Sequence, residues 1–294
     1  MYFSRVKVRP NIQELTQFHN VIRGNGYGVH QLLWDIFQES GKRSFLFREE
    51  IAGEQLSHYE GSRGAPIYYI VSQNEPGKRH PFFEIESKLY NPKIESGDRL
   101  AFKLRANPTV SRIEAGKKNS ARHDIVMDVQ YHYLRELAQD AGVDAAGKKS
   151  DLKARVLASS LSTKNPVISA KLESMLGGSG RYRYLLAQKL SPAKLFDQAL
   201  KATTDASLEK WLTDKGEHKG FKLLSDEKRN QQKFQAEGYR WHSLAKKGKA
   251  AGFSSVDFEG EIEVIDASQF IETLFRGIGP AKAFGCGLML VRRI

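Results

Sequence analysis

Cysteine is nearly absent from the sequence. The single thiol, Cys286, excludes an internal disulfide and any zinc site built from several cysteines. The eight histidines show none of the HxxxH, HxH or HExxH spacings that are typical of metal sites. We therefore expect no metal and no other cofactor. A Ser-His-Asp arrangement is not evident either, which leaves acid–base chemistry by histidine, tyrosine or lysine. Cys286 lies between two glycines and is predicted to fill space.

Long hydrophobic runs are missing as well. No apolar stretch approaches the length of a transmembrane helix. Residues 1–8 form a charged, alternating segment, which is typical of a strand and not of a signal peptide. The sequence therefore predicts a cytoplasmic protein without a membrane-bound segment.

Acidic residues are too few to balance the basic ones. The 34 Asp and Glu residues face 46 Lys and Arg residues, so the formal net charge is +12 and the pI is about 9.6. Between residues 164 and 250 basic residues outnumber acidic ones roughly two to one. Such a surplus attracts polyanions, of which nucleic acid is the commonest in the cytoplasm. Charge alone does not distinguish RNA, DNA and an anionic membrane surface.

The order of elements in the first part of the chain indicates an α+β fold. A strand over residues 2–8 precedes a helix that Asn11 can cap, a break at 23–26 and a second helix over 27–38. Four more strands are predicted, at 44–49, 66–72, 82–90 and 99–105. This order suits a ferredoxin-like (RRM-like) domain, to which we assign residues 1–115.

The rest of the chain repeats the pattern around an insertion. A helix over 124–139 is followed, near the C-terminus, by strands at 234–246 and 254–265, a helix at 267–276 and a last strand. The basic residues of 113–122 form an exposed crossing between the two parts. The prediction is two tandem ferredoxin-like domains, 1–115 and 123–294, with a helical basic insertion in the second at about 142–230.

A glycine-rich stretch at 277–288 precedes the last strand. Gly277, Gly279, Gly285 and Gly287 surround Lys282. Successive amides freed by glycine can form a concavity that binds phosphate. The alternative is a tight helix-to-strand connection with a glycine bulge. The spacing favours neither interpretation, although the missing Gly-Lys-Ser/Thr ending argues against a Walker loop.

One histidine is singled out by helical periodicity. At 100° per residue, the apolar side of the 27–38 helix centres between Val29 and Leu33, and His30 falls at its border. Tyr27, His30 and Trp34 share one stripe of the helix, so one ligand can meet all three. A border position gives the partial burial that suits an acid–base imidazole. The pattern alone nonetheless favours a packing role for His30 and Trp34.

Several segments, in this order along the chain, resemble the CasE family of CRISPR repeat-RNA endoribonucleases from type I-E systems. They are MYFSRV at 1–6, YGVHQLLWDIF at 27–37, LRANP at 104–108, FEGEI at 258–262 and GIGPAKAFGCGL at 277–288. The resemblance covers about residues 1–140 and 232–294. It does not extend to the insertion.

The resemblance implies a pair of ferredoxin-like domains that bind the repeat stem-loop and cleave precursor RNA at the base of the stem. In the family the reaction needs no metal, because the RNA's 2′-hydroxyl attacks the adjacent phosphodiester and leaves a 2′,3′-cyclic phosphate and a 5′-hydroxyl. The family's Tyr-x-x-His motif falls on Tyr27 and His30, which implies that His30 is the general acid or base and that Tyr27 assists. Family members keep the cleaved RNA and become a subunit of the Cascade complex.

Further RNA contacts follow from residue chemistry. The candidates are Lys282, Gly279, Gly285, Gly287, Arg105, Lys117, Lys118, Arg122 and Trp34. The predicted partners are CRISPR repeat RNA, before and after cleavage, and other Cascade subunits. Two alternatives stay open: a non-catalytic subunit that binds the RNA or assembles the complex, and a DNA-binding protein that uses the helical insertion.

Overall fold

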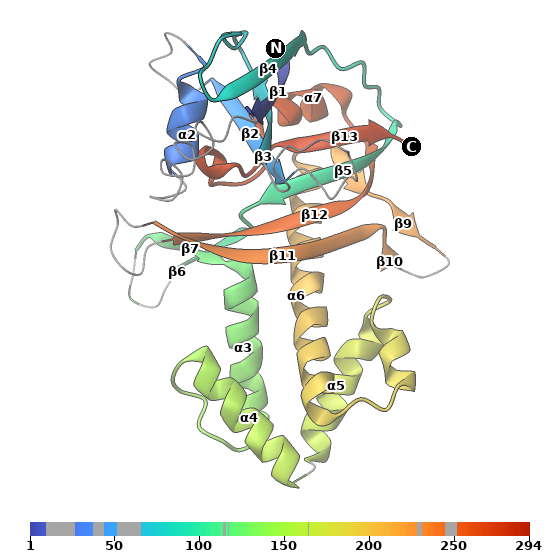
Figure 1. Cartoon of the computed structure of the whole chain (residues 1–294). Coiled ribbons are helices and arrows are strands. Elements are labelled where there is room, and N and C mark those ends of the chain that lie inside the picture. The colour runs from blue at the N-terminus through green and yellow to red at the C-terminus, as the bar shows by residue number, and fades with distance from the viewer. Residues whose placement is uncertain are drawn as a thin grey trace, which may run out of the picture. The chain divides into compact units, whose positions relative to one another are not determined.

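The chain divides into two compact units, seen here in a computed structural model (Figure 1). The structure describes residues 1–9, 27–37, 44–51, 66–113, 116, 118–163, 165–227, 231–244 and 252–294. The first unit comprises Met1–Asn107, Glu217–Lys222 and Glu237–Ile294, and the second comprises Pro108–Gly216 and Leu223–Ala236. The predicted helix after Asn11 and the break at 23–26 lie outside the described residues. No helix of the described residues is long and apolar enough to cross a membrane.

The first sheet has the strand order β2-β3-β1-β4. Its antiparallel strands are β1 (Tyr2–Val8), β2 (Phe45–Ile51), β3 (Pro66–Ser72) and β4 (Phe83–Leu89), and the helix α2 (Tyr27–Trp34) follows β1. Alternate residues of β1 are buried, as period-two patterning requires. Val6, Tyr68 and Ile70 form a core cluster with Leu33 of α2. The predicted helix and strands of this half are confirmed, although α2 ends at Trp34.

The second sheet has the order β11-β12-β5-β13. Its strands are β5 (Arg99–Ala106), β11 (Phe234–Ser243), β12 (Gly252–Val264) and β13 (Met289–Arg293), and β8 (Phe221–Leu223) also pairs with β12. The helix α7 (Ala267–Arg276) begins where predicted, because the Asp266 carboxylate accepts a hydrogen bond from the Gln269 amide over 2.9 Å.

One predicted strand joins a different sheet from the one expected. The strand at 99–105 exists as β5, but it pairs with β12 and β13, so that Leu104 lies opposite both Phe258 and Met289. With β5 as its first strand, the second sheet repeats the strand order of the first, as in two ferredoxin-like domains. Hydrophobic alternation shows that a strand exists but not which strand it pairs with. The ranges 1–115 and 123–294 themselves stay a prediction.

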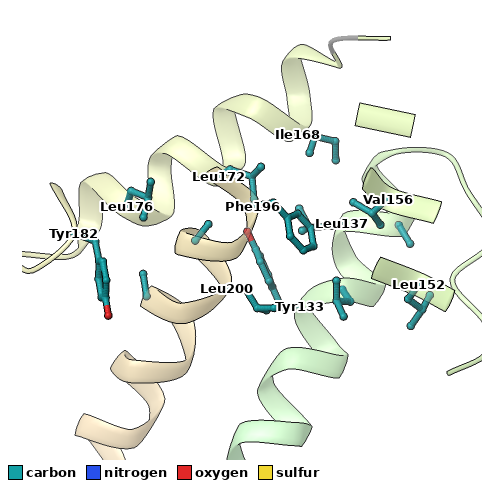
Figure 2. Packing of buried hydrophobic residues seen from close by; sticks show 14 of the residues in the cluster. Tyr133, Leu137, Leu152, Val156, Ile168, Leu172, Leu176, Tyr182, Phe196 and Leu200 are labelled. Carbon is teal, nitrogen blue, oxygen red and sulfur yellow. The ribbon is translucent and has the colours of Figure 1, made fainter. Parts of the chain in front are cut away.

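The second unit is mainly helical. It contains α3 (Ile125–Asp140), α4 (Lys149–Thr163), α5 (Pro166–Gly178), the 3-10 turn η1 (Arg183–Ala187) and most of α6 (Pro192–Glu217). Figure 2 shows Tyr133 and Leu137 of α3 packed with Phe196 and Leu200 of α6 in the core of this unit. The predicted insertion is therefore helical. Residues 193–215 of α6 contain no glycine or proline, which suits one long helix.

Short strands complete the second unit. The crossing predicted at 113–122 is part of an antiparallel hairpin of β6 (Thr109–Ile113) and β7 (Ser120–Asp124). Two-residue strands β9 (Ser225–Asp226) and β10 (Gln231–Gln232) pair with each other. The hairpin is exposed, as expected for a basic segment, and Asp124 at its end caps α3 by accepting a hydrogen bond from the Met127 amide.

Candidate functional site

The ring of His30 is packed between aromatic side chains. Its centroid lies 5.4 Å from that of Trp34, one turn further along α2, and 5.9 Å from that of Phe45 on β2. Only 7% of the residue is exposed. This burial is deeper than the predicted border position, because Phe45 covers a side that the helix alone leaves open. The packing fixes the orientation of the imidazole, whose Nε2 atom is buried.

The other two members of the predicted stripe differ in what the structure shows. Tyr27 is the first residue of α2, and its side chain lies outside the described residues. Trp34 is half-buried and meets Phe45 edge-on, with ring centroids 6.0 Å apart. Trp34 therefore packs against the core of the first sheet, and its predicted RNA contact stays a prediction for the exposed part of the ring.

The glycine-rich stretch is a tight connection between α7 and β13. All four glycines have positive φ angles, and Ala281 is left-handed as well. A Cβ atom on Gly285 would lie 3.1 Å from the ring of Phe47, closer than an ordinary contact, and the φ angle of 79° also favours glycine. The N–H of Gly287 donates a hydrogen bond to the carbonyl of Arg105 over 2.7 Å. The carbonyl of Gly287 accepts one from the N–H of Ile278 over 2.9 Å. The amide of Gly287 is thus used within the fold and not for phosphate.

The structure brings this stretch and the His30 helix together. The short 3-10 helix η3 (Lys282–Phe284) contacts both α2 and β2. Lys282 is half-buried, and its Cγ atom lies 3.2 Å from the position that a Cβ of Gly287 would take. Its aliphatic stem therefore packs over Gly287. A cationic side chain and the imidazole of His30 thus come from neighbouring elements, although they are some 250 residues apart in sequence.

Arg105 has a structural role that competes with its predicted contact to RNA. Its Nε and Nη2 atoms donate to both carboxylate oxygens of Asp257 over 2.9 and 3.0 Å, and its Nη1 atom donates to the carbonyl of Glu49 over 3.0 Å. Burial opposes the charge, but the hydrogen bond and the charge of Asp257 together raise the pKa of Arg105. These bonds use three of its five N–H donors, and the predicted contact of Arg105 with RNA stays a prediction.

The remaining basic candidates belong to the helical unit. Lys118 and Arg122 are exposed in and next to the β6–β7 hairpin. Lys117 lies outside the described residues. Their chemistry still suits phosphate contacts, and they stay predictions. Among the described residues, no group of three or more His, Cys, Asp or Glu side chains could hold a metal ion.

Sequence reasoning missed an aromatic column beside the glycine-rich stretch. The ring of His242 on β11 stacks on Phe253 of β12 at 4.5 Å, and Phe253 lies 4.9 Å from Phe284 of η3. Burial lowers the pKa of His242 most, and the charges of Arg240 and Arg105 lower it further. The Nε2 atom of His242 lies 2.8 Å from the hydroxyl of Ser255. The signal was available as the run Tyr239-Arg-Trp-His242, but alternating aromatic residues are also common in sheet cores.

Cys286 is expected to resist thiol reagents in the folded protein. It is fully buried, and burial raises the pKa of its thiol to about 12, so the reactive thiolate is scarce at neutral pH. Ellman's reagent should give no signal with the native chain and one equivalent of thiol in concentrated guanidinium. Cys286→Ser should give none in either condition. Fast labelling of the native chain would contradict a space-filling role.

Comparisons with known proteins point to one family. A family model described as "CRISPR associated protein" matches residues 1–293. The CRISPR-associated endoribonuclease Cse3 of Thermus thermophilus is 36% identical over 92 residues, which cover 30% of this chain and 44% of the relative. The Cascade subunit CasE of Escherichia coli is 45% identical over 42 residues, or 14% and 21% of the two chains. The matched segments thus span less than half the length of either curated relative.

Solved structures show the same fold. Thermus thermophilus Cse3, bound to an RNA that represents a pre-cleavage complex, superposes with a TM-score of 0.55 at 18% identity, over 99% of this chain and 98% of the other. Escherichia coli Cas6e gives a TM-score of 0.51 at 17% identity, with 100% of both chains covered. These structures have tandem ferredoxin-like domains, and the similarity confirms that fold class for this chain.

Proposed function

Because this chain belongs to the CRISPR associated protein family, we propose that it is an endoribonuclease that cleaves CRISPR precursor RNA at the base of the repeat stem-loop. The observation that carries the proposal is the packing of η3, with Lys282, against the helix that bears His30. An imidazole and an ammonium group on adjoining elements suit a reaction at a phosphodiester. The net charge of +12 supplies the attraction for RNA.

The reaction we propose is an internal transesterification that needs no metal. The 2′-hydroxyl of the RNA loses its proton and attacks the adjacent phosphorus, the bond from phosphorus to the 5′-oxygen breaks, and that oxygen takes up a proton. The products are a 2′,3′-cyclic phosphate and a 5′-hydroxyl. His30 transfers one of these protons, and Tyr27, the first residue of the same helix, assists it. Lys282 stabilises the negative charge that grows on the phosphate oxygens.

The packing of His30 supports this role. An imidazole held by Trp34 and Phe45 has few orientations open to it, so little rotational freedom is lost when RNA binds. The glycine-rich stretch contributes shape, because Gly285 lets the loop approach Phe47. The remaining contacts we propose are phosphate contacts by Lys118, Arg122 and Lys117 and by the loop around Gly279.

After cleavage, the protein keeps the mature RNA and joins other subunits of a Cascade complex in the cytoplasm. One observation favours a second candidate function. The 7% exposure of His30 also fits a purely structural imidazole, as in a non-catalytic subunit that binds the RNA and assembles the complex. Both candidate functions predict that the protein binds RNA, but only the first predicts that it cleaves RNA.

Cleavage of repeat RNA is expected to continue in excess EDTA. The purified chain should cut a transcript of its own repeat once, and the upstream product should carry a cyclic phosphate that resists alkaline phosphatase until acid opens the ring. The proposed mechanism requires this result, since the attacking oxygen belongs to the RNA and not to a metal-bound water. Strict dependence on added divalent metal would overturn the mechanism, and tight binding without cleavage at any pH would favour the assembly subunit.

A further inference from the structure

Strand β11 carries aromatic and basic side chains side by side. Tyr239, Arg240, Trp241 and His242 follow one another, and β11 is the outermost strand of its sheet in the described part of the chain. Trp241 is 52% exposed and Tyr239 is 40% exposed, although indole and phenol rings gain from burial. Arg240 is exposed too. Large exposed rings on a sheet edge are typical of a binding surface.

Trp241 is held in place by a glycine. A Cβ atom on Gly252 of β12 would lie 2.5 Å from the Cζ2 atom of Trp241 and 2.4 Å from the carbonyl oxygen of His242. No other residue fits there without moving the ring or the strand. A glycine inside a strand often marks such a close approach. The indole is therefore positioned by the fold while half of its surface stays open, which lowers the entropic cost of stacking a ligand on it.

The opposite side of β11 connects to the candidate active site. Side chains alternate along a strand, so Arg240 and His242 point away from the side of Trp241. His242 stacks on Phe253, which contacts Phe284 of η3. Arg240 is close enough to Glu49 of β2 to lower the pKa of that carboxyl, against the larger effect of burial. A strand of RNA that leaves the site over this edge would meet Arg240 and then Trp241.

We propose that Trp241 is a stacking platform for one unpaired nucleobase of the bound RNA, with Arg240, on the opposite side of this edge strand, at the sugar–phosphate backbone. The inference rests on the proposed function, because it places a single-stranded part of the repeat RNA at this edge. Every base offers a flat, apolar face that matches an exposed indole, and the neighbouring cation matches the phosphate. An exposed arginine at the adjacent position of this edge strand fits a polyanion better than it fits an apolar protein surface.

The test measures the affinity of three variants for a repeat stem-loop RNA with unpaired nucleotides on both sides of the stem. Trp241→Leu is expected to bind about tenfold more weakly than the wild type, as for the loss of one stacked base, and Trp241→Phe to bind nearly as well. Tyr184→Leu removes a 63% exposed ring from the helical unit and should leave the affinity unchanged. Circular dichroism checks that each variant folds.

A series of RNAs with a single abasic nucleotide identifies the stacked base. At one unpaired position, removing the base should weaken binding to the wild-type protein about as much as Trp241→Leu weakens binding to the intact RNA. The same abasic RNA should bind Trp241→Leu no more weakly than the intact RNA does, because both changes remove the same stacking interaction. The proposal is overturned if Trp241→Leu binds like the wild type, or if its loss is the same for every RNA in the series. In that case the ring serves the fold or a protein partner. Cleavage is scored separately, so a chain that binds without cutting refutes the proposed function while the abasic series still decides the role of Trp241.

Discussion

Replacing His30 by glutamine is expected to slow RNA cleavage by about 10²- to 10⁴-fold, the usual contribution of a positioned proton-transfer group. The affinity for the repeat stem-loop should stay close to that of the wild type, since most of the binding comes from phosphate contacts elsewhere. Glutamine is preferred to alanine because His30 packs between Trp34 and Phe45, and alanine would leave a cavity there. Single-turnover cleavage and filter binding measure the two effects separately.

The matched control is an exposed histidine. His132 lies on α3 and its Nδ1 atom hydrogen bonds to the carbonyl of Asp128, one turn earlier. His132→Gln should cleave at the wild-type rate. If His30→Gln lost affinity and thermal stability along with cleavage, its role would be structural, as the deep burial of the ring allows. A pH–rate profile adds a second criterion, because the limb that His30 contributes should disappear in His30→Gln while binding persists.

The fold was predictable wherever local pattern decides structure. Period-two alternation predicted β1, and Asp266 predicted the start of α7, because both signals act within a few residues. The pairing of β5 was not predictable in this way. In the second sheet β5 lies between β12 and β13. Both of these strands come more than 140 positions later in the chain. Alternation along β5 is the same whichever sheet it joins.

In the candidate site, too, features set by neighbouring residues were predictable, and features set by residues far away in the sequence were not. The helix face of His30 followed from periodicity, whereas its burial depends on Phe45, which comes from another element. The resemblance of residues 27–37 and 277–288 to the CasE family identified both halves of the site, but not that η3 packs on α2. The ion pair of Arg105 was not predictable for a related reason, because its carboxylate partner, Asp257, lies 152 residues further along the chain.

Asp257 is a polar residue whose loss should strongly destabilise the first unit. Its carboxylate accepts hydrogen bonds from Arg105 of β5 and, over 3.3 Å, from Arg48 of β2. It therefore joins the two sheets of this unit through a pair of cations. The side chain of Arg48 is only 3% exposed, and that of Arg105 is 23% exposed. Arg48 also pairs with Glu50, and Asp257 is the partner that these two arginines share.

Asp257→Ala is expected to lower the free energy of unfolding by about 3 kcal/mol, because it leaves two largely buried guanidinium groups short of a counter-charge. Urea denaturation followed by tryptophan fluorescence measures the change. Glu259→Ala is the matched control: Glu259 lies two residues further along the same face of β12, and its pair with Lys103 is about half exposed on both sides. Its loss should cost about 0.5 kcal/mol or less.

The contrast between these two variants separates burial from charge. Both remove one carboxylate from the same face of the same strand, so a net-charge effect would destabilise them equally and would vanish in high salt. The network around Asp257 is largely shielded from solvent, so the destabilisation by Asp257→Ala should persist in high salt. Since Gly287 donates its amide to the backbone of Arg105, a displaced β5 would also shift the glycine-rich stretch beside His30. Asp257→Ala should therefore slow cleavage at temperatures where the chain is still folded, whereas Glu259→Ala should not. Equal rates for the two variants would show that the stretch is held by the other contacts of η3 instead.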